Sequence, residues 1–446
     1  MTQRVSACAL MLAFLLAWPD QVLAEELETA ETSPESLALE ARIAELEARL
    51  QTMSDRLDED ELQALIGKAD VAALNPAEEE PPENRVFVAA GRAMQKTNPE
   101  ISVSGDMLWE LPIDDDFRAG TPYGMGMPVR AFGVHMQSVL DPFSVAKIAF
   151  ELFPDPDEPV NLEEVHITWF GIIPNVSLTL GRFRPDFGAV QRGHEHDLDQ
   201  TNYPEALFLL GYGGLTGHGA TAKWMMPKLW AHAQEMTFAV FDGDNATLFS
   251  GEPFHNPAGM ARLKNYWDIN ESTYLELGFS GVAGRNNTTA ATDALPDAEW
   301  GTTVVGGADL KLYWSPLQQA RYRSLTWQSE LYLVEKQLPG APEWDRGIGA
   351  YSYLQYQLGA SWFAGLRGDW VRPIAGTGWE NYDGVLEGQL ARDDLWRAVP
   401  YATFWQSEFV YVRAEYWYTQ GFDDAVEHRV LLQVDFAAGP HKHEKY

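Results

Sequence analysis

The stretch that decides the fold is HRVLLQVDF, the run from His428 to Phe436 near the end of the chain. Its apolar positions alternate with a second set that is mostly polar: Val430, Leu432, Val434 and Phe436 against Arg429, Leu431, Gln433 and Asp435. Successive side chains of a β-strand point to opposite faces, so this run has one apolar face and one mostly polar face. The polar face is too charged for a protein core, and it suits the wet interior of a membrane barrel.

The same period of two recurs from residue 99 onward. It is clear in 145–153, 164–169, 308–314, 325–333, 362–370 and 410–418. Several of these runs carry paired charges on the polar face and aromatic residues at the ends of the apolar face, which favours a membrane barrel over a soluble sandwich. Turn signals such as Pro174-Asn175 and Pro339-Gly340 separate the runs. With strands of about 10 residues, region 99–436 predicts an all-β fold, an antiparallel transmembrane β-barrel of about 16 strands around an aqueous lumen.

Composition excludes several classes of protein. The chain of 446 residues has a formal net charge of −33, and nucleic acid is excluded as a partner because phosphate binding needs a surplus of Lys and Arg. An acidic surface suits an envelope protein or a channel that favours cations. Beyond Ala24 no apolar stretch approaches the roughly 18 residues of a spanning helix, which excludes a helical membrane protein.

Residues 1–24 predict a secretory signal peptide. Arg4 gives a basic start, an apolar run extends from Ala7 to Trp18, and Val22-Leu23-Ala24 is a small-residue cleavage site. The alternative, a membrane anchor, conflicts with the shortness of the run. The only cysteine, Cys8, would be removed with this segment, so we expect a mature protein without disulfides or thiolate chemistry.

An α-helical coiled coil is expected ahead of the barrel. After a disordered acidic segment at 25–36, region 37–66 contains a heptad seam: Leu39, Ile43, Leu46, Leu50, Met53 and Leu57. The apolar seam favours self-association, a homotrimer above a dimer, and the alternative is a single amphipathic helix packed on the barrel. Region 67–98 is a linker because its prolines and charges oppose regular structure.

The layout of signal, coiled coil, linker and barrel resembles a group of Gram-negative outer-membrane porins. These are porins with an N-terminal periplasmic coiled coil, such as phosphate-selective porin-like and dicarboxylate porin-like proteins. The similar segments are 98–105, 181–188 followed by His194-Glu195-His196 and Asp199, and the tail 437–446. The run ending in Phe436 resembles the signature strand that the barrel assembly machinery recognises, although ten further residues follow it here. The resemblance implies an outer-membrane location with surrounding lipid, a periplasmic coil, and, for some members, a link to zinc supply.

Two His-x-His pairs are candidate metal ligands: His194 with His196, and His441 with His443. In an extended chain residues i and i+2 point the same way, so both imidazoles of a pair could hold one ion. Neutral imidazole with neighbouring carboxylates suits zinc, copper or nickel. The alternative is that both pairs are ordinary polar residues of a loop and of the terminus.

Four pairs of charges on the polar faces are candidate pore-lining residues. They are Lys147 with Glu151, Asp309 with Lys311, Arg367 with Asp369, and Arg413 with Glu415. Such charges can set a field across a pore and so determine selectivity. The alternative is mutual neutralisation on a wet wall.

These features favour a channel for diffusion of small hydrophilic solutes that is not anion-selective. The alternative is a metal-binding or metal-uptake protein that uses the His pairs with zinc. An enzyme is not expected, because the sequence has no nucleophile elbow, no His-Glu-x-x-His and no phosphate-binding Gly-rich loop. An energy-coupled receptor would need a folded plug before residue 99, where only a coil and a linker are expected. The remaining alternative is a structural tether with an occluded barrel.

Overall fold

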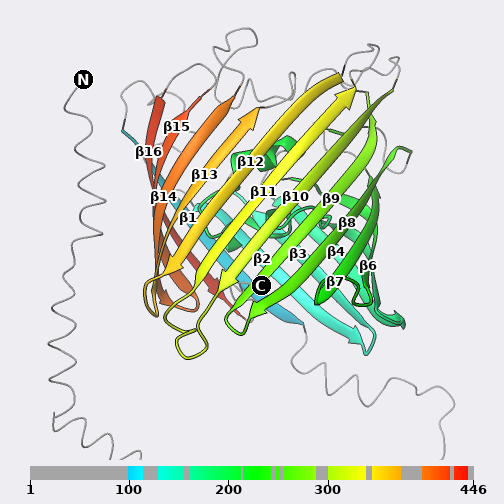
Figure 1. Cartoon of the computed structure of the whole chain (residues 1–446), viewed down its shortest axis with the longest axis horizontal. Coiled ribbons are helices and arrows are strands. Elements are labelled where there is room, and N and C mark those ends of the chain that lie inside the picture. The colour runs from blue at the N-terminus through cyan, green and yellow to red at the C-terminus, as the bar shows by residue number, and fades with distance from the viewer. Residues whose placement is uncertain are drawn as a thin grey trace, which may run out of the picture. The chain divides into compact units, whose positions relative to one another are not determined.

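The computed structural model describes residues 99–113, 129–154, 160–211, 214–242, 248–250, 255–287, 300–337, 344–372, 394–421 and 426–439 (Figure 1). The predicted signal peptide, acidic segment, coiled coil and linker lie outside the described residues. So do His441 and His443.

Sixteen strands form one closed barrel, in which every strand is antiparallel to its neighbours and β1 pairs with β16. The strands are β1 (Glu100–Pro112), β2 (Val129–Asp141), β3 (Ser144–Leu152), β4 (Val160–Ile173), β5 (Val176–Phe183), β6 (Gly217–Met225), β7 (Ala233–Asp242), β8 (Pro257–Asn270), β9 (Thr273–Asn286), β10 (Gly301–Trp314), β11 (Leu325–Gln337), β12 (Trp344–Gln357), β13 (Trp362–Arg372), β14 (Leu395–Ser407), β15 (Val410–Gln420) and β16 (Val426–Ala438). The predicted fold class and strand number are confirmed. Closure leaves the described sheet without an unpaired edge.

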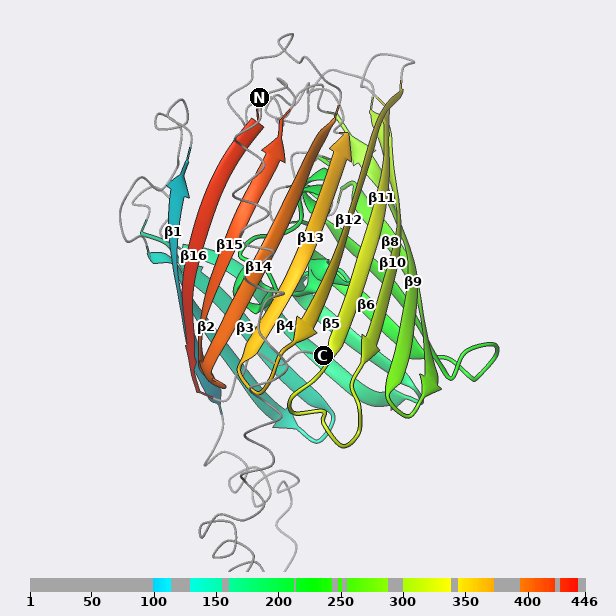
Figure 2. The same ribbon diagram turned by 60° about the vertical axis from the view of Figure 1, so that its left-hand side comes forward.

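The two ends of the barrel differ in the length of their connections (Figure 2). At one end, here the turn end, strands join closely, as at Asp141 to Ser144 and Asn270 to Thr273. At the other, the loop end, strands are farther apart in sequence, as at Phe183 to Gly217. The predicted turn at Pro174-Asn175 joins β4 to β5, where Asn175 has a φ of 61°. Asparagine is among the few residues that tolerate this left-handed conformation.

The burial pattern of the strands is the reverse of a soluble protein. On β11, Trp327, Leu331 and Leu333 are exposed, whereas Gln328, Glu330 and Lys336 are buried. On β16, Leu432 and Phe436 are exposed and Gln433 and Asp435 are buried. An apolar outside and a polar inside are what a barrel needs in lipid.

Exposed aromatic side chains gather near both ends of the strands. Phe143, Phe170, Trp224, Trp230 and Trp362 lie toward the turn end, and Trp300 and Trp344 lie toward the loop end. Aromatic belts of this kind sit at the two membrane–water interfaces. The outer wall therefore has the two boundaries that a bilayer imposes.

The last strand runs beyond the predicted barrel end at Phe436. Ala437 and Ala438 continue β16 and pair with Ser104 and Val103 of β1. The extension exists because β1 begins far enough toward the turn end to supply these partners. Among the residues that the structure describes, no helix is long and apolar enough to cross a membrane.

Candidate functional site

The connection between β5 and β6 folds into the barrel. We call its described part, 184–211 and 214–216, the constriction segment. It contains the short helices η3 (Val190–Arg192), η4 (Glu195–Asp197) and η5 (Glu205–Leu210), which Figures 1 and 2 show inside the ring of strands. Most of the segment is buried, and Phe187 and Leu210 are 0% exposed. A polar barrel interior thus encloses a small apolar core made by its own connection.

Apolar packing holds one side of the constriction segment against the wall. Phe187, Ala206 and Leu209 share a buried cluster with inward side chains such as Val305 and Tyr332. The wall has glycines where this contact is closest. A Cβ on Gly349 would lie 2.8 Å from Leu209 Cδ1, and one on Gly307 would lie 2.8 Å from Phe187 Cε1. Larger side chains there would push the segment toward the lumen.

Buried charges on the wall bind the backbone of the segment. Glu330 accepts hydrogen bonds from Ala189 N at 3.0 Å and Val190 N at 2.7 Å. Glu415 of β15, four strands along the ring from β11, accepts from Thr201 N at 2.7 Å and Thr201 Oγ1 at 2.8 Å. These bonds satisfy backbone groups that lack the partners of a regular sheet. Hydrogen bonds to charged groups are stronger than neutral ones, so the segment is firmly anchored.

Arginines supply the matching donors. Arg413 Nη2 donates to Leu198 O at 2.8 Å, and Arg367 Nη1 donates to Asn202 O at 2.8 Å. Arg397 forms an ion pair with Glu205. Charges from β13, β14 and β15 therefore hold successive parts of one segment.

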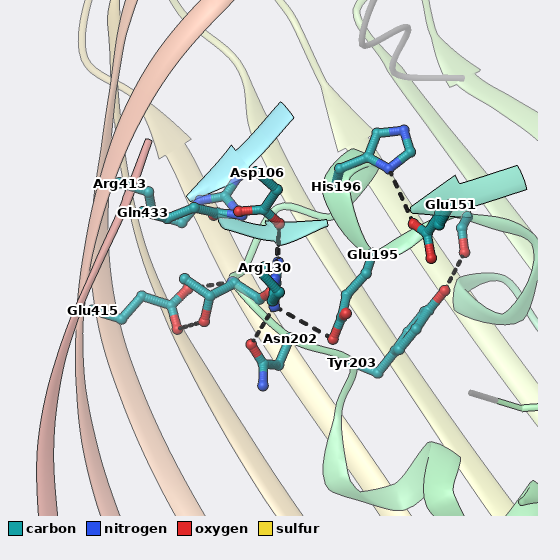
Figure 3. A network of polar contacts seen from close by, with 12 residues as sticks. Asp106, Arg130, Glu151, Glu195, His196, Asn202, Tyr203, Arg413, Glu415 and Gln433 are labelled. Atoms are coloured by element: carbon teal, nitrogen blue, oxygen red, sulfur yellow. Dashed lines mark hydrogen bonds and ion pairs between the residues drawn. The ribbon is translucent and has the colours of Figure 1, made fainter. Parts of the chain in front are cut away.

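Arg130 of β2, which lies seven strands along the ring from Glu330 of β11, is the centre of a further network (Figure 3). Its Nε donates to Asp106 Oδ2 at 2.9 Å, and its Nη1 donates to Thr201 O at 2.7 Å. The same nitrogen donates to Asn202 Oδ1 at 2.9 Å and lies 3.5 Å from Glu195 Oε1. The segment is thus tied to both sides of the barrel and spans the lumen between them.

The structure separates the predicted pore-lining residues into two groups. All eight come from inward-facing positions of strands, but Asp309, Arg367, Asp369, Arg413 and Glu415 are buried. Asp309 pairs with Arg262 Nη2 at 2.9 Å and Arg367 pairs with Asp369 at 3.0 Å. Lys147, Glu151 and Lys311 are more exposed. The buried group serves the constriction segment and its supporting wall.

The predicted pair His194 and His196 is joined by a third imidazole, His135 of β2. The ring centroids lie 5.1 Å apart for His135 and His194, 5.2 Å for His135 and His196, and 5.6 Å for His194 and His196. We call these three residues the histidine cluster. The expected extended geometry is wrong, because His196 lies in η4. A 3-10 turn nevertheless brings the two rings together.

Carboxylates surround the histidine cluster. His194 Nδ1 lies 2.6 Å from Glu163 Oε2, and its Nε2 lies 3.3 Å from Glu164 Oε2. His196 Nδ1 lies 4.0 Å from Glu151 Oε1 (Figure 3). Burial lowers the pKa of His194, but its bonds to Glu163 and Glu164 outweigh burial and raise this pKa to about 9. In the conformation of the described residues, no three His, Cys, Asp or Glu side chains converge as a metal site.

Asp186 of the constriction segment forms ion pairs with three basic side chains. Arg192 Nε is 3.1 Å from Asp186 Oδ1, Lys223 Nζ is 3.0 Å from Oδ2, and Arg262 Nη1 is 3.3 Å from Oδ1. Burial raises the pKa of Asp186, but the three cations more than offset this and hold the pKa well below its usual range. Asp186 is therefore ionised at neutral pH.

No family model and no curated protein matches this sequence. Solved structures are similar to it at low sequence identity. An anion-selective porin from Comamonas acidovorans is similar at 10% identity with a TM-score of 0.50, covering 76% of this chain and 100% of that chain. The outer-membrane channel DcaP of Acinetobacter baumannii is 11% identical with a TM-score of 0.49, covering 76% of this chain and 96% of that chain. Pseudomonas putida OprB is 10% identical with a TM-score of 0.49, covering 78% and 96%.

Proposed function

We propose that this protein is an outer-membrane channel of a Gram-negative bacterium through which small hydrophilic solutes diffuse past a fixed constriction. The observation that carries the proposal is the constriction segment, which buried charges anchor on both sides of the lumen. A barrel of this strand number is wide enough for water, so a tethered segment narrows it to a selective size. The apolar outer wall and its aromatic belts support the membrane location. We also propose that the N-terminal coil lies in the periplasm.

Transport by such a channel requires no covalent chemistry. The more exposed lumen cations have carboxylate partners: Lys147 pairs with Glu164 at 2.5 Å, and Lys223 pairs with Asp186 at 3.0 Å. Paired charges on a wet wall leave little net field. We therefore propose a channel without anion selectivity, which a reversal potential in a salt gradient measures directly.

The size limit of the pore is the first functional test. Proteoliposomes containing the refolded full chain are placed in isotonic solutions of uncharged solutes of increasing size, and swelling is recorded. The proposal predicts rapid swelling with the smallest solutes and a sharp fall with size. Equal swelling with and without the protein would contradict it, provided that the barrel is folded by its heat-modifiable migration on a gel.

We propose further that the chain is a homotrimer held partly by the heptads of region 37–66, and that the barrel assembly machinery inserts it. Native mass spectrometry of the full chain should show three copies. Charged substitutions at two seam positions, Leu46→Lys and Leu50→Lys, should reduce that population, because they place like charges in an apolar seam. The same substitution at Glu47, outside the seam, is the matched control. A monomer in the parent chain contradicts the trimer.

The histidine cluster supports a second candidate function, the binding of a transition-metal ion such as zinc as cargo. Two imidazoles on one tetrahedral zinc place their ring centroids roughly 5 Å apart. The centroid distances of 5.1, 5.2 and 5.6 Å are close to this spacing. Binding would require the rings to turn toward one point and His194 to release its proton.

Calorimetric titration of the full chain with zinc tests this candidate. We expect His135→Ala to weaken binding at least about tenfold, because even the loss of a residue that only supports a metal ligand costs about tenfold or more in affinity. His232→Ala is the control, because His232 lies in a turn and its side chain is 56% exposed. Equal affinity in the parent and His135→Ala would reject the cluster as the site. Weaker zinc binding in His135→Ala but not in His232→Ala would support it.

A further inference from the structure

Three tyrosines form a continuous aromatic surface on the inner wall. Tyr266 of β8, Tyr274 of β9 and Tyr313 of β10 occupy neighbouring strands, and the register places all three on the inward face with Arg262, Ser280 and Asp309. The ring centroids are 5.4 Å apart for Tyr266 and Tyr274, and 5.2 Å apart for Tyr274 and Tyr313. The rings are tilted by 34° and 31°. We call this surface the tyrosine ladder.

The tyrosine ladder lies on the turn-end side of the constriction. On β10, Asp309 pairs with Arg262, which also contacts Asp186 of the constriction segment. Lys311 and then Tyr313 are the next inward residues toward the turn end. A solute that passes the constriction along this wall therefore meets the ladder directly afterward.

Most other inward tyrosines of the described barrel hold the constriction segment in place. Tyr332, Tyr351, Tyr353, Tyr401 and Tyr411 are buried, and their hydroxyls bond the constriction segment or the side chains that hold it. The ladder rings are only half-buried; they contact one another, and the hydroxyl of Tyr266 bonds Asp268 rather than the constriction segment. Support of the segment therefore does not explain their presence.

The polar groups beside the ladder are paired. Lys264 Nζ lies 2.9 Å from Glu276 Oε2, and Tyr266 Oη donates to Asp268 Oδ1 at 2.6 Å. In the register Glu276 stands opposite Tyr266 on one side and Lys311 on the other. The border of the aromatic surface thus offers both donors and acceptors with little net charge.

We propose that the tyrosine ladder is a binding site for the ring of a neutral sugar. The flat face of a sugar ring presents C–H groups with a small positive charge, which complement the negative face of an aromatic ring. Its hydroxyls are donors and acceptors at once, as the paired border requires. A few placed polar groups around an aromatic surface are the usual composition of a small-molecule site. This inference rests on the proposed channel function and names its solute class.

Block of the ion current through the reconstituted full chain tests the inference. Maltose and sorbitol are added separately on the turn side, and the concentration that halves the current is determined for each. Both are neutral polyols, but sorbitol has no ring. We expect maltose to act at a concentration about tenfold lower, a ratio that one or two aromatic contacts provide.

Variants test whether the rings of the tyrosine ladder cause the block by maltose. Tyr274→Ala with Tyr313→Ala should raise the half-blocking concentration of maltose about tenfold and leave that of sorbitol unchanged. Tyr274→Phe with Tyr313→Phe keeps the rings and should retain most of the maltose block. Tyr322→Ala is the matched control, because Tyr322 is 50% exposed in the β10–β11 turn.

The possible results distinguish failure of the sugar site from failure of the channel function. Equal block by maltose and sorbitol, or full maltose block in the double alanine variant, overturns the sugar site. Stronger block by benzoate than by maltose overturns the neutral-sugar class in favour of ring anions. The absence of any current from a folded barrel would instead overturn the proposed channel function, so the two failures are distinguishable.

Discussion

Replacement of Glu330 by glutamine should loosen the constriction segment while the barrel stays folded. Glu330 is 2% exposed and binds four donors. Its Oε1 accepts from Val190 N at 2.7 Å and Tyr351 Oη at 2.5 Å, and its Oε2 accepts from Ala189 N at 3.0 Å and Tyr332 Oη at 2.7 Å. Glutamine keeps the shape but exchanges one acceptor oxygen for a donor. One of the two backbone N–H groups is then buried without its acceptor.

The magnitude follows from the bonds that are lost. A hydrogen bond to a charged group contributes about 1.5–3 kcal/mol, and glutamine removes two acceptor contacts on one side. The loss at the segment is therefore about 3 kcal/mol even at the lower limit. Since 1.4 kcal/mol corresponds to a factor of ten, the detached population of the segment should rise roughly a hundredfold.

Single-channel recording measures this change. We expect Glu330→Gln to show a higher mean conductance and more open-channel noise than the parent, because the segment leaves the wall more often. Glu335→Gln is the matched control on the same strand. The Glu335 side chain is 45% exposed and pairs with Arg346 at 3.0 Å, an exposed pair that contributes at most about 1 kcal/mol.

Parent-like conductance and noise in Glu330→Gln, with heat-modifiable migration intact, would refute the reasoning. That result would mean that the apolar contacts hold the segment without help from the charge. A barrel that does not fold at all would be separated from this outcome by the gel assay.

Three further predictions follow from the same structure. Gly349→Leu should displace η5 from the wall and lower the conductance, since even a Cβ would lie 2.8 Å from Leu209; an unchanged conductance would disprove the close packing. Asp186→Asn should lower the unfolding temperature by the same amount at pH 7 and pH 5. The folded-state pKa of Asp186 is lowered, so its contribution is complete above the unfolded value of about 3.9 and is lost only as pH falls below it. Leu432→Arg on the exposed outer face should cost about 2–4 kcal/mol near the bilayer midplane in denaturant titration. An unchanged stability of Leu432→Arg would contradict the assignment of Leu432 to the lipid-facing side.

The strands were predictable because the alternation of apolar and polar residues lies within the sequence of each strand. Alternation in 325–333 and 428–436 needs no knowledge of the partner strand, and the structure places these runs in β11 and β16 with the expected faces. The end of β16 at Ala438 was harder to predict from the sequence, because Ala437 and Ala438 are small and the apolar pattern fades there. Their strand conformation depends on pairing with β1.

The roles of the inward charges were not predictable from the same pattern. Arg413 and Arg367 lie on polar faces, as expected, but their partners are the carbonyls of Leu198 and Asn202, far away in sequence. Only closure of the barrel around the segment brings them together. A signal for the segment does exist, since 184–216 has no regular alternation and includes the apolar run Ala206–Leu210. Such a stretch between two strands needs a buried surface to cover it.

His135 illustrates the same limit for the candidate metal site. A single histidine in a strand gives no sign of a partner, whereas His194 and His196 attract attention by their spacing. The fold places β2 against the constriction segment, and the third ring becomes visible only then. Arg130 and Glu330 were missed as anchors for the same reason.

The measurement that tests the central claim most directly is the single-channel conductance of the refolded full chain in a planar bilayer, with the reversal potential in a salt gradient. The account predicts discrete current steps, a conductance that rises with bath salt, and no anion preference. A correctly folded, heat-modifiable barrel that inserts into the bilayer and passes no current would contradict it.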